Sequence, residues 1–515
     1  MKQTNNKTIA KNTMFLYFRM IVTMAISLYT SRVILQILGV DDFGIYQAVG
    51  GIVGMLSFVN NALATGSSRF LTFGIGEGNM DKLKKIFSTV LIAHICLAFI
   101  IAVIAETAGL WFLYNKLAIP FERLDAAVYT FHISILTAFF SLTQVPYNAS
   151  IIAHERMSVY AYMSIFDAVC KLLIVFNLNI GEIDKLKLYA TLLCILQIGI
   201  MLFYRFYCRF HFSETHFKFV FEKQIFKEIA GFSGWSLFAN SSIALNNQGV
   251  LLLLNMFFSP SVVAARSISI QVNMHAYQLV SNFQTAAVPQ IVKTYAAHEY
   301  DKSKYLLLQI CKFSFYLMLI ISLPLCLVAE QVLSLWLVVV PEYTVVFLQI
   351  IIIQGLFQIF DTTFYYALYA KGQLRENALI SPTLGFLHFP AVYILFKLGF
   401  SPIVLSWASL VVCAILGIII KPLLIIKVVD YKWTDIFSVF IPCLKVTIAS
   451  LPLSLLSYKY LHCHDNQILS FILITVISVI SVVLSIWFCG LTLDLRKKVL
   501  VAIRDRLFTI IHFNR

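Results

Sequence analysis

The chain has 515 residues, of which 60% are hydrophobic and only 12% are charged. A soluble protein would carry about twice that charged fraction, so the composition excludes a soluble globular enzyme and indicates an integral membrane protein. The net charge of +14 is explained by basic loops facing the cytoplasm and by attraction to anionic membrane lipids, so no nucleic-acid partner is expected.

About fourteen apolar segments are long enough to cross a bilayer, which predicts an all-α integral membrane fold. The connections are too short for a soluble domain, and the first segment is too long to be a cleavable signal peptide. The predicted spans are 14–38, 43–73, 86–113, 126–152, 159–179, 188–206, 226–258, 262–292, 305–328, 344–370, 378–396, 402–429, 436–461 and 468–491.

Lysine and arginine are concentrated on alternate connections, including 82–85, 218–227 and 302–304. The connections between these basic ones carry few positive charges. By the positive-inside rule, both termini are predicted to be cytoplasmic.

The first two spans contain arginine: Arg19 and Arg32 lie in the first, and Arg69 lies near the end of the second. An arginine near mid-bilayer costs roughly 2.5–3.5 kcal/mol, so these side chains should face a wet cavity or a partner. The alternative is snorkelling from a helix end or pairing with a neighbouring helix, and it fits Arg19 least well. Arginines placed inside the membrane indicate an anionic cargo.

An offset of about 220 residues relates the first hairpin to a second one, as expected for the internal repeats of transporters. Each half carries six predicted spans, so the halves should be related by an axis along the membrane normal. The sequence therefore predicts a first lobe over 1–215, a second over 216–432, and two additional spans over 433–515. A basic amphipathic helix at 494–513 should lie on the cytoplasmic surface.

Polar residues follow helical spacing in several spans, which places each set on one face. The general alternative is hydrogen bonding between helices, which membrane bundles use routinely. Four such faces favour an aqueous cleft between two bundles, lined by groups that a sugar would meet. The candidate sugar-facing residues are Asn61, Gln271, His275, Gln278, Asn282 and Gln358.

Ionisable residues near mid-span are candidates for ion coupling, although local pairing explains most of them. Asp361 lies in a polar stripe and is the main candidate, followed by Asp167 and Lys171, which are spaced to form a local pair. The ten cysteines are scattered and predict no disulfide framework. No cofactor is expected, and without a P-loop the energy must come from an ion gradient, the membrane potential or product withdrawal.

Several stretches resemble bacterial polysaccharide flippases of the Wzx type: RMIVTMAISLYTSRVILQILGVDDFGIYQAVGGIVG, SRFLTFGIGEGN, VPYNASIIAHERM, AARSIS and LWLVVVPEYT. That family belongs to the multidrug/oligosaccharidyl-lipid/polysaccharide exporter (MOP) superfamily, with the MATE transporters and MurJ lipid II flippases. The resemblance implies two six-helix lobes around a central cavity, two extra helices and alternating access. The implied cargo is an undecaprenyl-pyrophosphate-linked oligosaccharide for surface polysaccharide such as O-antigen or capsule, moved to the outer leaflet.

The same resemblance implies a cationic cavity for the pyrophosphate, to which Arg19, Arg69 and Arg266 correspond by motif position. Arg32 lies thirteen residues after Arg19, so a bend or an unwound turn is needed for both to reach one cavity. A transporter of this type is not an enzyme. A polysaccharide polymerase and glycosyltransferases are its implied partners.

Two other functions remain open. A MATE-like exporter of drugs or cations would place carboxylates in its cavity, whereas this chain places arginine in its first hairpin. A membrane glycosyltransferase or polymerase could use Asp41 and Asp42 in the first outer turn, but a turn of solvated carboxylates is the expected reading. A short tract at 462–465 contains two histidines, a cysteine and an aspartate, and without a second cluster it predicts no metal site.

Overall fold

The computed structural model describes residues 2–77, 79–154, 156–178, 183–216, 220–373, 375–461, 467–493 and 495–497. Across these ranges the chain is helical and contains no β-strand. Helices are the natural solution for a chain this apolar, because each one satisfies its own backbone hydrogen bonds without water. Eleven helical segments in the described part of the chain are long and apolar enough to cross a membrane, which makes this a multi-pass membrane protein.

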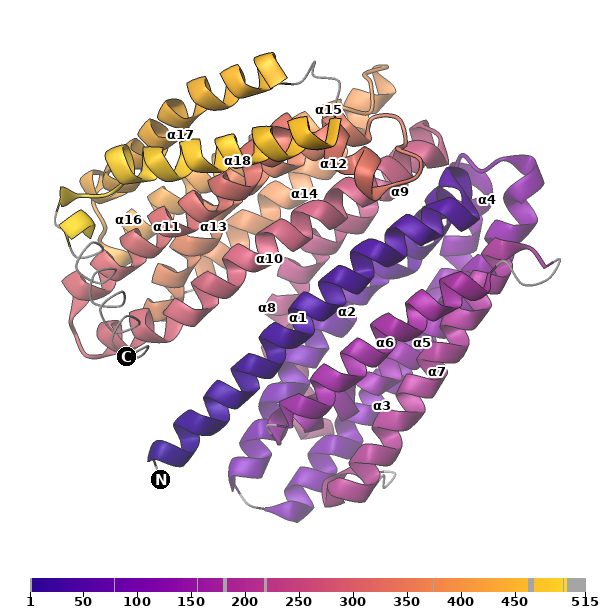
Figure 1. The fold of residues 1–515 in the computed structure, drawn as a ribbon. Coiled ribbons are helices and arrows are strands. Elements are labelled where there is room, and N and C mark those ends of the chain that lie inside the picture. Colours follow the sequence, from indigo (N-terminus) through magenta and orange to yellow (C-terminus); the bar gives the residue numbers. More distant parts are fainter. Residues whose placement is uncertain are drawn as a thin grey trace, which may run out of the picture. The chain divides into compact units, whose positions relative to one another are not determined.

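The predicted spans all fall on long helices (Figure 1). Three of these long helical runs, which are α2, α8 with α9, and α10, are not among the eleven candidates, so the count of fourteen stays a prediction. The α-helices are α1 (Lys2–Leu38), α2 (Val40–Glu77), α3 (Met80–Ile104), α4 (Leu110–Lys116), α5 (Leu124–Ala153), α6 (Met157–Asn177), α7 (Lys185–His211), α8 (Lys223–Ala244), α9 (Val250–Phe257), α10 (Pro260–Ala296), α11 (Tyr300–Leu327), α12 (Ala329–Trp336), α13 (Thr344–Lys371), α14 (Arg375–Lys397), α15 (Val404–Ala414), α16 (Lys421–Val429), α17 (Trp433–Leu461) and α18 (Gln467–Ser485).

The described part of the chain contains four π-helical segments, three of them within long helical runs and one at the end of α18. They are η1 (Ala105–Gly109) between α3 and α4, η4 (Leu245–Gly249) between α8 and α9, η5 (Ile415–Ile420) between α15 and α16, and η6 (Ile486–Gly490) after α18. Such segments are frequent at functional positions because they widen the helix locally and re-aim side chains. Two short 3-10 turns, η2 (Phe121–Arg123) and η3 (Ser213–Thr215), precede α5 and follow α7.

The chain divides into two compact units. The first comprises Met1–Ile268, Trp336–Thr344 and Ala378–Leu405, and the second comprises Ser269–Leu335, Val345–Asn377 and Ser406–Arg515. This grouping places α8, α9 and α14 with the first six spans. The division into lobes at residues 215 and 432 stays a prediction.

The first unit is built around α2 and α5, which pack against each other. The helix α5 also packs against α3 and α7, and α2 against α8. One part of its core surrounds the fully buried Phe131 and includes Ile45, Val49 and Leu252. A second part surrounds Phe87, whose ring meets that of Tyr147 edge to face at 5.3 Å. Trp336, the last residue of α12, also belongs to this unit, and its Nε1 donates to the carbonyl of Leu28 at 2.6 Å.

The second unit contains α17 and α18, which pack against each other and against α11. Its aromatic core centres on Phe360 of α13, which stacks on Phe315 of α11 at 5.2 Å and meets Phe440 of α17 at 4.9 Å. The two additional helices predicted after residue 433 are therefore packed into this unit through apolar side chains.

A single residue, Gly39, joins α1 to α2. Its φ is +82°, in the left-handed region where a side chain would be strained, so glycine both ends α1 and allows the sharp reversal. Close to this turn, Gly44 of α2 allows contact with the start of α10. A Cβ on Gly44 would lie 2.0 Å from the carbonyl oxygen of Pro260.

We expect Gly44→Ala to destabilise the protein, because the added methyl would overlap the backbone of Pro260 and force α2 and α10 apart. Overpacking of this kind costs typically about 1–3 kcal/mol. The matched control is Gly50→Ala in the same helix, where a Cβ would meet no atom within 4 Å. Thermal unfolding of the detergent-purified proteins measures both changes. Equal melting temperatures for the two variants would contradict the expected overlap.

Candidate substrate site

The four arginines predicted for the cationic cavity differ in what the structure shows of them. Arg266 on α10 is almost completely buried, with 6% of its surface exposed, whereas Arg32 on α1 is exposed. The side chains of Arg19 and Arg69 lie outside the described part of the structure. The helix α1 continues without interruption from Lys2 to Leu38. An unwound turn, one of the two ways to bring Arg19 and Arg32 to one cavity, is therefore not present.

Arg266 lies in a polar cluster of the first unit, which we call the Arg266 cluster: Arg266, His388, Asn246 and Ser242. The guanidinium is close enough for its charge to act on the imidazole of the buried His388 on α14. His388 Nδ1 hydrogen-bonds to Asn246 Oδ1 at 2.7 Å. Asn246 Nδ2 in turn donates to the carbonyl of Gly385 at 3.1 Å, and Ser242 Oγ donates to the carbonyl of Pro382 at 3.0 Å.

The π-helical segment η4 positions this cluster because it supplies Asn246 and also packs against α2. A Cβ on Gly54 would lie 3.3 Å from Gln248 Cδ, so the glycines of α2 allow the glutamine to approach closely. Gly51 makes a similar, looser contact with Gln248. At these two positions α2, which carries the second predicted span, packs against η4.

Five of the predicted sugar-facing residues lie in the second unit, on α10 and α13. Gln271, His275, Asn282 and Gln358 are half-buried, and Gln278 is exposed. The side chain of Asn61 lies outside the described residues. Sequence reasoning missed Gln284, which is buried on α10 and donates from Nε2 to Thr363 Oγ1 at 2.8 Å. Gln284 is not at helical spacing from Gln278 and Asn282, because it lies on the buried side of α10.

Asp361, the main coupling candidate, is part of an ion pair that the sequence analysis did not foresee. Its Oδ1 lies 3.0 Å from Nζ of Lys421 on α16, and the lysine side chain is only 4% exposed. The same ammonium donates to Asn377 Oδ1 and lies 5.6 Å above the ring of Tyr365. Asp361, Lys421, Asn377 and Tyr365 form the Lys421 cluster. A lysine inside the twelfth predicted span was the available signal for it.

Two further pairs of ionisable residues lie in the spans. Lys171 Nζ lies 2.7 Å from Asp167 Oδ2 on α6, as their spacing allows. His132 Nδ1 on α5 lies 3.0 Å from Glu106 Oε1, which belongs to η1. Polar contacts between helices also account for part of the fourth-span stripe, since Gln197 Nε2 on α7 donates to Gln144 Oε1 at 2.8 Å.

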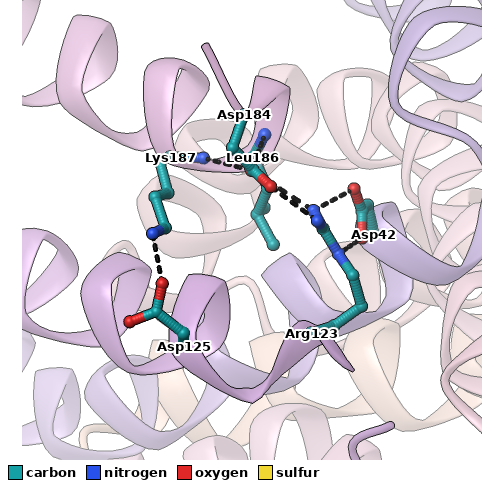
Figure 2. Close-up of polar contacts among 6 residues, drawn as sticks. All are labelled: Asp42, Arg123, Asp125, Asp184, Leu186 and Lys187. Atoms are coloured by element: carbon teal, nitrogen blue, oxygen red, sulfur yellow. Dashed lines mark hydrogen bonds and ion pairs between the residues drawn. The ribbon is translucent and has the colours of Figure 1, made fainter. Parts of the chain in front are cut away.

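A network of charged residues joins the ends of several helices in the first unit (Figure 2). The guanidinium of Arg123 in η2 donates to both carboxylate oxygens of Asp42 at 2.8 and 2.6 Å. It also donates to both oxygens of Asp184, at 2.5 and 3.2 Å. The planar fork of arginine suits such two-fold contacts. The network links the first turn of α2 to the start of α7, and a second pair, Lys187 with Asp125, lies beside it.

Asp184 also caps α7, because its Oδ1 accepts hydrogen bonds from the backbone N–H groups of Leu186 and Lys187 at 3.0 and 3.2 Å. Burial alone would raise the pKa of Asp184, but the hydrogen bonds and charge of Arg123, together with the cap, lower it below its ordinary value. The carboxylate is therefore charged at neutral pH and stabilises the folded state there.

The network corrects one expectation. Asp42 is not in a solvated turn, since both of its carboxylate oxygens are bound by Arg123. This carboxylate is held in an ion pair that joins two helix ends, which is a structural role. The histidine-containing tract at 462–465 lies outside the described residues. Within the described ranges, no group of three potential metal ligands comes together.

Comparison of the sequence with known families and with curated proteins finds no match. The structure, however, is similar to that of the lipid II flippase MurJ in an inward closed conformation. The TM-score is 0.68 at 12% identity, over 92% of this chain and 98% of the flippase. An inward-facing multidrug resistance MATE family transporter of the MOP superfamily has a TM-score of 0.66 at 15% identity, over 80% of this chain and 99% of the transporter.

The chain has the fold of MurJ and the MATE transporters. A MOP superfamily transporter from Pyrococcus furiosus gives a lower TM-score of 0.57 at 16% identity, over 82% of this chain and 97% of the transporter. The resemblance read from the sequence motifs is therefore confirmed at the level of the fold.

We expect Arg123→Met to destabilise the protein by about 2 kcal/mol, because it leaves two partly buried carboxylates without their shared donor. Lys187→Met, which breaks an ion pair with the more exposed Asp125, should cost less. The lowered pKa of Asp184 means that its contribution is present above the ordinary carboxyl range and is lost as the pH falls below it. The difference in melting temperature between wild type and Arg123→Met should thus persist from pH 7 to 5 and shrink in stronger acid. A constant difference at all pH values would contradict this assignment.

For the Lys421 cluster, we expect Lys421→Met to cost roughly 3–5 kcal/mol because it leaves the carboxylate of Asp361 without its cation. The double variant Asp361→Asn/Lys421→Met removes both charges and should recover most of that loss. Thermal unfolding of the three purified proteins gives the coupling between the two residues. Additive effects would show that the ion pair does not hold α13 and α16 together.

Proposed function

We propose that this protein is a flippase of the MOP superfamily that moves a polyprenyl-pyrophosphate-linked oligosaccharide to the outer leaflet of the bacterial cytoplasmic membrane. The main support is the share of this chain that matches each of the similar solved structures. The lipid II flippase accounts for 92% of this chain, whereas the MATE transporter accounts for 80% while being matched over almost its full length. The chain thus shares more of its architecture with a transporter of lipid-linked sugars.

The charges inside the spans support an anionic cargo. A pyrophosphate that enters the bilayer must exchange water for fixed positive charge, because an uncompensated anion there is prohibitively costly. Arg266 keeps a guanidinium inside an apolar helix, and guanidinium stays charged and binds phosphate oxygens in two-fold fashion. We propose Arg266, Arg19 and Arg69 as pyrophosphate ligands, with Arg32 as a further candidate.

The alternative of a MATE-like exporter of cations needs a carboxylate that can bind the cation. The candidate for that role, Asp361, already lies against the ammonium of Lys421. This pairing favours the flippase. For Asp361 to bind a coupling ion, Lys421 would have to be displaced from it.

We propose that the polar side chains of α10 supply hydrogen-bonding groups to the cargo. Gln271, His275, Gln278 and Asn282 follow one another at helical spacing, and Gln358 lies on α13. Such groups suit hydroxyl-rich sugars. A polymerase and glycosyltransferases that act on the same lipid-linked sugar are the proposed partners, and both termini are proposed to be cytoplasmic.

The test is complementation of a strain that lacks its own oligosaccharide flippase. We expect Arg266→Ala and Arg19→Ala to abolish surface polysaccharide while leaving protein levels in the membrane unchanged, and the Lys variants to restore it only in part, since ammonium lacks the planar fork. The control is Arg156→Ala, at an exposed arginine between α5 and α6, which should support normal display.

Surface polysaccharide is quantified by immunoblotting, and the accumulated lipid-linked precursor by mass spectrometry of inner-membrane extracts. Normal display by both Ala variants at normal protein levels would refute the cationic ligands. Loss of display without accumulation of the precursor would instead place the defect before translocation.

A further inference from the structure

Two arginines at one end of α7 stand outside the proposed substrate site. Arg205 and Arg209 are four residues apart, which places them on the same face of the helix. The charges of both act on Tyr147 of α5. Arg205 lies 5.8 Å from the centre of the Tyr147 ring, so the two side chains and the tyrosine form one local group.

The guanidinium of Arg205 is turned toward the protein and does not extend to water as a snorkelling arginine would. Its Nη2 donates to Thr143 Oγ1 at 3.1 Å. Its Nε is buried and has no hydrogen-bond acceptor among the described residues. A buried donor of this kind is costly, and its presence in a native protein calls for an explanation such as a bound anion.

No described carboxylate lies within ion-pair distance of either arginine. Glu214 is an acidic residue that the structure describes in this region, and its charge acts on Cys208 next to Arg209. That carboxylate is buried and engaged elsewhere, since its Oε1 lies 2.6 Å from Nε2 of His154. His154 is itself fixed by stacking on Phe212 at 4.1 Å. Two positive charges therefore remain uncompensated by the part of the protein that the structure describes.

The same end of α7 carries an exposed aromatic stripe. Phe203, Phe206 and Phe210 are 42%, 57% and 82% exposed. Arg205 is six residues before the end of α7 at His211, which corresponds to about 9 Å along the helix. We expect the end of α7 to lie at the membrane surface, which places Arg205 within reach of lipid headgroups. Basic residues predict that this end faces the cytoplasmic leaflet, where anionic lipids bind basic sites between helices.

We propose that Arg205 and Arg209 bind the phosphate of an anionic glycerophospholipid, whose acyl chains lie along the stripe formed by Phe203, Phe206 and Phe210. The guanidinium groups supply charge and donors to the phosphate, and the exposed rings supply an apolar surface to the chains. A glycerophospholipid combines both chemistries in one molecule. The bound lipid neutralises the charge beside Tyr147 and joins the ends of α5 and α7. This site does not depend on the identity of the transported cargo.

The test measures binding of defined lipids to the full-length protein in detergent micelles by native mass spectrometry, together with thermal unfolding. We expect phosphatidylglycerol to bind and stabilise the wild type, and phosphatidylcholine to have little effect. Arg205→Gln/Arg209→Gln should weaken binding of phosphatidylglycerol by roughly tenfold to thirtyfold, since each basic residue near a lipid surface contributes.

The matched control is Lys223→Gln/Lys227→Gln, which removes two exposed charges with the same spacing from the start of α8. It should retain wild-type binding. If the double arginine variant does not fold, Arg209→Gln alone, at an exposed position, should still weaken binding, and Arg205→Lys should preserve part of it.

Three results would overturn the proposal. Equal binding of phosphatidylglycerol by wild type and the arginine variants would show that the site lies elsewhere. Equal stabilisation of the wild type by millimolar inorganic phosphate would assign the arginines to a free anion. Displacement of the lipid by undecaprenyl pyrophosphate, with the same dependence on Arg205 and Arg209, would make the site part of the transport route.

Discussion

The free-energy cost of an ionised side chain inside an apolar helix determines which residues must lie beside it in this structure. A chain that spans the bilayer many times can keep an ionised side chain in a span only by giving it a partner, and three different partners are used here. Lys421 is held by a carboxylate, an amide and an aromatic ring. Arg266 lies beside the imidazole of His388, within a set of amide and hydroxyl hydrogen bonds. Arg205 has a hydroxyl and a tyrosine ring, and we assign the missing anion to the membrane itself.

The same principle separates structural charges from candidate functional ones. Arg123 makes four hydrogen bonds to Asp42 and Asp184, so its role is to hold together the helix ends that carry these residues. Asp361 and Lys421 form an ion pair, and any role in coupling requires the pair to separate. Arg266, which is buried and whose charge acts on the imidazole of His388, is the cation that we propose as a ligand for an anionic cargo.

The sequence was sufficient to predict an all-helical fold of long apolar helices, since length and hydropathy are local properties that do not depend on how the helices pack. It also identified the short reversal between α1 and α2, which depends on one glycine with positive φ. It did not reveal that Asp42 pairs with Arg123 across 81 positions, or that Asp361 pairs with Lys421. Both pairs join different helices, and opposite charges in two spans cannot be matched without knowing which helices are neighbours. The polar stripes were visible by spacing, but the spacing did not show that Gly51 and Gly54 give room to Gln248.

The four π-helical segments change how the spans can be compared along their length. A π turn accommodates one residue more than an α turn, so the helix beyond it is rotated by about 100° relative to an uninterrupted one. A helical wheel drawn across η4 would therefore assign the residues of α9 to the wrong side, and the same holds for α4 after η1 and α16 after η5. Deletion of one residue within such a segment would be expected to restore α-helical winding and turn the following helix as a whole. Single-residue insertions and deletions at these points thus offer an evolutionary route to redirect an entire helical face without changing the side chains on it.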